Sequence, residues 1–269
     1  MTRKPVVAGQ FYPGNPAQLR AFLQEAMPPQ SALLKAIGVV APHAGYVYSG
    51  KVAGKVFGRV IVPDAVVLLG PNHTGLGTRA SIMSEGAWAT PLGTAPIDAA
   101  LAAALKTACP LLEEDSLAHA HEHSLEVEVP FLQHRNPSVQ IVPIALMLRG
   151  FDDIEDMGDA IAQVLAGWPD PVLLVASSDM THYEAHETAK SKDARAIEKV
   201  LALDARGLLD TTARHRISMC GVIPAAVVLV AAKRLGATRA ELVAYSTSGE
   251  ASGDYDRVVG YAGLAVGAW

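Results

Sequence analysis

Short apolar runs alternate with segments of helical patterning along the whole chain. Five runs rich in Val, Ile and Leu end in polar or glycine-rich residues, and they cover 36–43, 64–73, 139–147, 171–182 and 241–249. Their apolar character is continuous rather than alternating, which is typical of strands covered on both faces. Apolar residues recur at helical spacing in 16–26, 49–60, 97–107, 154–167, 189–203 and 223–235.

Strands that alternate with helices predict an α/β fold, with a central, largely parallel or mixed β-sheet flanked by helices. No linker rich in Gly, Ser or Pro interrupts the alternation, and no internal repeat or low-complexity segment is present. We therefore expect a single domain over residues 1–269. A chain of this length can bury a sizeable core.

Composition narrows the class of protein. Half of the residues are hydrophobic and 18% are charged, a balance typical of globular proteins. The net charge of -5 and the lack of a Lys/Arg cluster argue against nucleic-acid binding. No segment has the length of a membrane span or the core of a signal peptide, and two cysteines are too few for a disulfide scaffold. These features predict a cytoplasmic protein with free thiols that binds no membrane.

Candidate chemistry lies where the apolar runs end, because ligands of open α/β sheets bind beyond the carboxyl ends of the strands. His43 follows the first run in "VVAPHAGYVYSG", and His73 ends the second in "GPNH". The fourth run ends with Asp179 and His182 in "SSDMTH". Imidazoles at one edge of a sheet suit a transition-metal ion. Each histidine could instead cap a loop by hydrogen bonding to the backbone.

Asp179 and His182 lie three residues apart. A carboxylate near an imidazole fixes its tautomer and raises its basicity, as a general base or a metal-orienting pair requires. The residues 177–179, Ser-Ser-Asp, could also cap the helix that follows. The two interpretations are compatible, since a cap can lie beside a site.

Histidines are densest in "AHAHEHSLEVEVPFLQH", residues 118–134. In this stretch His119, His121 and His123 alternate, and acidic residues are interleaved with them at Glu122, Glu126 and Glu128. In a helix, His119 and His123 would share one face. We expect one of the three histidines to line a site, rather than all three to bind one metal ion.

Cys220 precedes an apolar helix in "MCGVIP". The pKa of a thiol at a helix N-terminus is lowered, which would make Cys220 a nucleophile or a soft metal ligand. Cysteine is also a common small residue of hydrophobic cores, and Cys109 is interpreted in that way. The chain lacks G-x-S-x-G, P-loop, dinucleotide-binding and H-E-x-x-H motifs.

Seven motifs in order resemble the Memo family, and the resemblance covers essentially the whole chain from residue 7. The motifs are "VAGQFYPG" (7–14), "APHAGYVYSG" (41–50), "LLGPNHTG" (68–75), "ATPLGT" (89–94), "HEHSLEVEVPFLQ" (121–133), "SSDMTHY" (177–183) and "MCGVIP" (219–224). The resemblance implies a fold similar to the class III extradiol dioxygenases, which are non-haem Fe(II) enzymes.

Carried over motif by motif, the resemblance implies the metal ligands His43, His73 and Cys220. It implies Asp179, His182 and His123 as catalytic residues, with His182 in the acid/base role. His123 and Glu122 of the "EHS" motif are implied to border the pocket. A thiolate in place of the dioxygenase carboxylate shifts the preference toward softer ions, so the expected cofactor is Fe(II) or Cu, or else Zn.

Three functions fit these residues. The first is a metal-dependent oxidoreductase on a dioxygenase-like scaffold. The second is a non-catalytic module that recognises a peptide or a small anionic ligand in the same pocket, although no arginine cluster suited to phosphate lies near it. The third, implied by the family alone, is a partner of AMMECR1-like or radical-SAM proteins.

Overall fold

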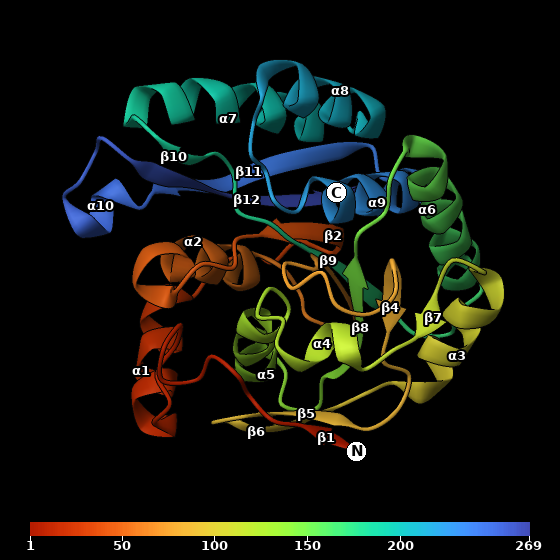
Figure 1. Ribbon diagram of the computed structural model, residues 1–269. Helices are drawn as coiled ribbons and strands as arrows, with labels where there is room; N and C mark the ends of the chain where they lie inside the picture. Colours follow the sequence, from red (N-terminus) through yellow and green to blue (C-terminus); the bar gives the residue numbers. More distant parts are fainter.

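A nine-stranded mixed sheet forms the centre of the computed structural model, which describes all 269 residues (Figure 1). The four central strands are parallel, whereas β12 runs antiparallel to β2, and β4 runs antiparallel to β8. In spatial order the strands are β10 (His182–Glu184), β12 (Val258–Gly267), β2 (Ala36–Ala41), β9 (Val172–Ser177), β3 (Ala65–Pro71), β8 (Gln140–Leu146), β4 (Ala80–Ile82) and β7 (Glu113–Glu114), with β11 (Arg239–Thr247) also paired to β12. The predicted α/β fold is confirmed.

The continuous apolar runs form the buried middle of the sheet. Every residue of β3 is buried, and only the first residues of β2, β8 and β9 reach solvent. Each of these strands ends one to five residues before the predicted run does. The polar residues that end the runs leave the sheet and form the loops at its carboxyl edge.

All six predicted helices are present, with ends that differ by at most three residues from the predicted ranges. They are α1 (Pro16–Ala26), α2 (Tyr46–Arg59), α3 (Ala99–Ala108), α6 (Phe151–Ala166), α7 (His186–Leu201) and α9 (Val222–Arg234). The additional helices are α4 (Leu117–Ala120), α5 (Val129–Arg135), α8 (Ala205–His215) and α10 (Gly249–Ser252). None of the helices combines the length and apolar character needed to cross a membrane.

Helices α2 and α9 cover opposite faces of the sheet. A side chain at Gly38 of β2 would collide with Val228 of α9, and one at Gly263 of β12 would collide with Val56 of α2. Val40 pairs with Leu264, so these two residues share one face of the sheet. Gly38 lies two residues from Val40 and is on the same face, whereas Gly263 is adjacent to Leu264 and is on the opposite face. The two glycines let the helices approach the backbone closely, and one continuous hydrophobic core results.

A second, small sheet holds the N-terminus against the rest of the fold. It consists of β1 (Thr2–Arg3), β5 (Ala87–Thr90) and β6 (Gly93–Pro96), seen at the bottom of Figure 1. The Arg3 guanidinium lies 4.2 Å from the centre of the Trp88 ring. It donates to the carbonyl oxygens of His119 (2.7 Å) and Glu122 (2.6 Å), so β1 fixes this histidine-rich segment.

Arg3 also forms a buried ion pair with Glu126. Arg3 Nη1 lies 2.7 Å from Glu126 Oε2, and the two side chains are 6% and 1% exposed. The carboxylate accepts further hydrogen bonds from the N–H groups of Val6 and Val7 and from the hydroxyl of Tyr12. All hydrogen-bond donors to the Glu126 carboxylate come from residues 3–12. The carboxylate therefore joins the N-terminal residues to the 119–128 segment, which is far away in the sequence.

We predict that Arg3→Met lowers the free energy of unfolding by about 3 kcal/mol, because it leaves a buried carboxylate without its cation. Urea denaturation followed by circular dichroism measures the loss. Arg79→Met is the matched control, since Arg79 pairs with Asp153 but is 59% exposed. An equal loss in both variants would contradict the assignment of Arg3 and Glu126 as a structural anchor.

Candidate metal centre

The predicted residues at the strand ends meet because three of the strands are neighbours. Strand β9 lies between β2 and β3, and all three are parallel. Their carboxyl ends therefore open at one edge of the sheet. His43 follows β2, His73 follows β3, and Asp179 follows β9.

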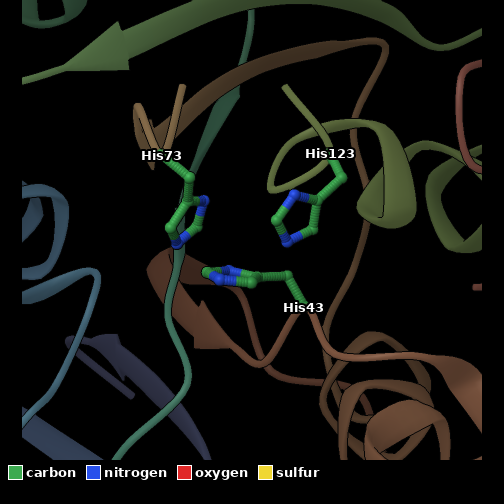
Figure 2. Close-up of side chains that lie close together, drawn as sticks. All are labelled: His43, His73 and His123. Carbon is green, nitrogen blue, oxygen red and sulfur yellow. The ribbon is translucent and has the colours of Figure 1, made fainter. Parts of the chain in front are cut away.

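A third imidazole joins His43 and His73 at this edge. His123 comes from the segment between α4 and the short 3-10 turn Glu126–Glu128, and Figure 2 shows the three rings facing one another. The ring centres lie 5.2 Å (His43–His73), 5.6 Å (His43–His123) and 4.8 Å (His73–His123) apart. One ligand atom of each ring lies within 4.8 Å of the other two.

The cluster is open on one side. His43 is only 2% exposed, whereas the side chains of His73 and His123 are 35% and 25% exposed. His43 thus forms the floor of the cluster, and the other two imidazoles lie on the side that faces solvent.

Glu122 organises the two outer histidines. Its carboxylate lies 2.9 Å from Nδ1 of His73 and accepts the N–H groups of His73, His123 (2.9 Å) and Ser124 (2.8 Å). Burial alone would raise the pKa of Glu122, but the hydrogen bonds and the charge of His73 outweigh it and lower this pKa to about 2. An ionised carboxylate only accepts hydrogen bonds, so Nδ1 of His73 is the donor, and Nε2 is the ring atom left to bind a metal ion.

The floor histidine is held from three sides. Nδ1 of His43 lies 2.8 Å from the hydroxyl of Ser177, and its backbone N–H donates to Asp179 Oδ1 at 2.9 Å. Nε2 lies 3.3 Å from the sulfur of Cys220. Burial lowers the pKa of His43 well below its ordinary value, and the neighbouring imidazoles lower it further. A neutral ring with a free nitrogen is the form that binds a metal ion.

His123 is also kept neutral. Burial lowers the pKa of its ring, and the charge of His73 acts in the same direction, whereas that of Glu122 opposes it. The ring of Phe11 packs against His123, with 4.9 Å between the ring centres.

Cys220 lies beside the cluster, just before α9. Burial raises the pKa of its thiol, and the charge of Asp179 raises it further. The lowered pKa expected from its position before a helix is therefore wrong, since burial outweighs the helix dipole. Cys220 touches Nε2 of His43 but is not one of the three donors that all lie close together. Its assignment as the third ligand stays a prediction.

Asp179 contacts His43, and His182 opens strand β10 three residues later; their catalytic roles stay predictions. Asp179 is 5% exposed and accepts the N–H groups of His43 and Ala44, at 2.9 and 3.3 Å. Burial raises the pKa of Asp179, while these hydrogen bonds and the charge of His182 counteract it. Nδ1 of His182 lies 3.0 Å from the carbonyl oxygen of Ser218, which can only accept, so Nδ1 is the donor in this contact.

The interpretation of residues 177–179 as a cap of the following helix is wrong. The next helix, α7, begins at His186, beyond β10, and its N-cap residue Ala185 makes no capping bond through a side chain. Ser178 instead accepts the N–H of Gly221, the N-cap residue of α9, at 3.0 Å. The polar residues after β9 thus bind α9 to the sheet.

Of the three histidines in the histidine-rich stretch, only His123 joins the cluster, as predicted. His119 is 0% exposed, donates from Nε2 to the carbonyl oxygen of Ser81 at 3.2 Å and contacts Trp88 edge-on. His121 is exposed. Helix α4 ends at Ala120, so no helix places His119 and His123 on one face.

The whole chain matches known proteins. The family model described as Memo-like protein covers residues 3–265. The chain belongs to the Memo-like family. A MEMO1 family protein of Methanopyrus kandleri is 44% identical, with 98% of each chain aligned. The MEMO1 family protein of Methanosarcina barkeri is 42% identical, and the alignment covers 98% of this chain and 99% of that protein. The one of Methanothermobacter thermautotrophicus is 38% identical, and the alignment covers 98% of this chain and all of that protein.

Among solved structures, an uncharacterized protein of Escherichia coli K12 shares the fold. It aligns with a TM-score of 0.58 at 15% identity, covering 86% of this chain and 100% of that one. At this identity the likeness supports the α/β architecture alone. Family membership therefore confirms the resemblance stated from the motifs, and the geometry of the histidine cluster carries the functional argument.

We predict that protonation of His119 destabilises the fold below neutral pH. Burial lowers the pKa of His119 from 6.5 to about 4, so the unfolded chain takes up a proton between these values and the folded chain does not. The free energy of unfolding therefore falls as the pH drops from 6.5 toward 4, by about 3 kcal/mol for this group.

The measurement is chemical denaturation at pH 7 and pH 4 of the wild type and of His119→Gln, whose amide can still donate to Ser81. We expect the wild type to lose more stability than the variant. Other buried histidines contribute to both proteins and cancel in the comparison. An identical pH dependence would show that His119 does not titrate as described.

Proposed function

We propose that His43, His73 and His123 hold a transition-metal ion and that the protein uses it for redox chemistry on a small substrate. The observation that carries the proposal is the convergence of three imidazole donors, each within 4.8 Å of the others, at the carboxyl edge of the sheet. Three protein ligands with open positions are typical of catalytic rather than structural metal sites.

The residues present fit a metal ion. Imidazole is a good ligand for Fe, Cu and Zn, which agrees with the Fe(II), Cu or Zn expected for this chain. His73 is hydrogen-bonded through Nδ1 to Glu122, an arrangement that orients metal-binding histidines and raises their basicity. Cys220, whose sulfur lies 3.3 Å from Nε2 of His43, is the candidate for a further donor and would favour Cu or Zn.

Two further groups are the candidates for proton transfer in this reaction. Asp179 is a buried carboxyl whose pKa is raised, and His182 donates from Nδ1 to the carbonyl oxygen of Ser218. A carboxyl and an imidazole with different environments can serve as acid and base in one reaction. A bound ion would supply Lewis acidity or electron transfer, while Asp179 and His182 would hold and move the protons of the substrate.

We predict that His43→Ala and His73→Ala each weaken binding of Co²⁺ or Zn²⁺ by more than about 100-fold, because loss of a ligand costs more than the 10–100-fold typical of an outer hydrogen-bond partner. Isothermal titration of metal-free protein measures the affinity. His121→Ala is the matched control, since this exposed residue lies two positions from His123 and outside the donor set.

Equal affinity in the wild type and in the two site variants would contradict the metal centre. Stabilisation of metal-free protein by a peptide or a small anion would instead support the non-catalytic binding module. Co-purification with a second protein that needs the cluster would support the partner role.

A further inference from the structure

The hydroxyl of Ser177 has one proton and three close partners beneath the histidine cluster. Its Oγ lies 2.6 Å from the carbonyl oxygen of Ser124, 2.8 Å from Nδ1 of His43 and 3.0 Å from Oε1 of Glu128. Ser177 and Glu128 are both 0% exposed, so water does not compete for these bonds.

Only one arrangement of protons satisfies all three contacts. A carbonyl oxygen can only accept, so the single proton of Ser177 points to Ser124. The other two partners must then donate to the lone pairs of Ser177 Oγ. His43 donates from Nδ1–H, and Glu128 donates from a carboxyl O–H.

A protonated Glu128 agrees with its surroundings. No Lys, Arg or His forms a salt bridge with it, and its second oxygen, Oε2, has no hydrogen-bond partner. Burial raises the pKa of Glu128 well above its ordinary value, the contact with the Ser177 hydroxyl opposes this, and the charge of Asp179 raises it further. An ionised carboxylate here would be a buried, unpaired charge, which is far more costly than a neutral acid.

We propose that Ser177 and Glu128 are positioning residues that fix His43 as the Nδ1–H tautomer and so keep its Nε2 free for the metal ion. This inference rests on the proposed metal-binding function. It adds to that function the residues that orient the metal ligands, because two of the three histidines are then held through Nδ1 by different hydrogen-bond partners. A charged carboxylate holds His73 at the opening, and a hydroxyl backed by a neutral acid holds His43 at the floor.

Nitrogen-15 NMR of the His43 ring in metal-free protein tests the tautomer directly. The wild type is expected to show a protonated Nδ1 and an unprotonated Nε2. In Ser177→Ala the acceptor for Nδ1–H is lost, and we expect the Nε2–H form to appear, because Nε2–H can donate to the Cys220 sulfur. Ser81→Ala is the control, since it removes an equally buried hydroxyl that bonds to Thr78 and does not touch His43.

Metal affinity gives a second readout. Ser177→Ala is expected to weaken Zn²⁺ binding about 10–100-fold, the loss typical of an outer partner of a ligand. Glu128→Gln is expected to bind Zn²⁺ almost as well as the wild type, because the neutral amide can donate N–H to Ser177 in place of the carboxyl O–H.

Infrared difference spectra of the wild type and Glu128→Gln at pH 7 test the protonated acid. The proposal predicts that the variant loses the C=O band of a protonated carboxyl group. It is overturned by a wild-type His43 ring protonated at Nε2, by an unchanged tautomer in Ser177→Ala, or by loss of a carboxylate band in Glu128→Gln. Since the NMR and infrared samples contain no metal, these results are independent of whether the cluster binds one.

Discussion

Backbone hydrogen bonds pair β2 and β3 in parallel on either side of β9, and this pairing brings the site together. The three strands point in one direction, so residues 43, 73 and 177–179 emerge at one edge although the sequence separates them by 30 and by more than 100 positions. The strands are nearly fully buried, and a slip of one residue would turn their side chains to the wrong face. The register of the sheet thus sets the positions of His43 and His73.

The third imidazole depends on how the fold accommodates three buried carboxyl groups between residues 122 and 128. Each avoids an unpaired charge in a different way. Glu122 is ionised and accepts hydrogen bonds from His73 and backbone N–H groups, and Glu126 forms an ion pair with Arg3. Glu128 has no cation and is interpreted as a neutral acid. These contacts tie the segment that carries His123 to the sheet on one side and to the N-terminal strand on the other.

Much of the fold could be predicted from the sequence, because the central strands and long helices have strong periodic patterns. Strand β12 escaped prediction, since Gly260, Gly263 and Gly267 weaken its pattern and its pairing with β2 and β11 decides its structure. Helix α8 was missed although Asp204 caps it through the N–H of Gly207. The strand-end rule predicted that His43, His73 and Asp179 would meet. It could not place His123, which reaches the site from a loop, or Ser177 and Glu128, whose roles arise from burial and contacts.

The most direct test of the central claim concerns His123, because its place in the donor set distinguishes the geometry found here from the ligands His43, His73 and Cys220 implied by sequence. X-ray absorption spectroscopy of cobalt-loaded protein resolves imidazole and sulfur ligands. The account predicts three imidazoles around the ion in the wild type and the loss of one in His123→Ala. A spectrum that is unchanged in His123→Ala and contains a sulfur at about 2.3 Å, a metal–thiolate distance, would contradict it.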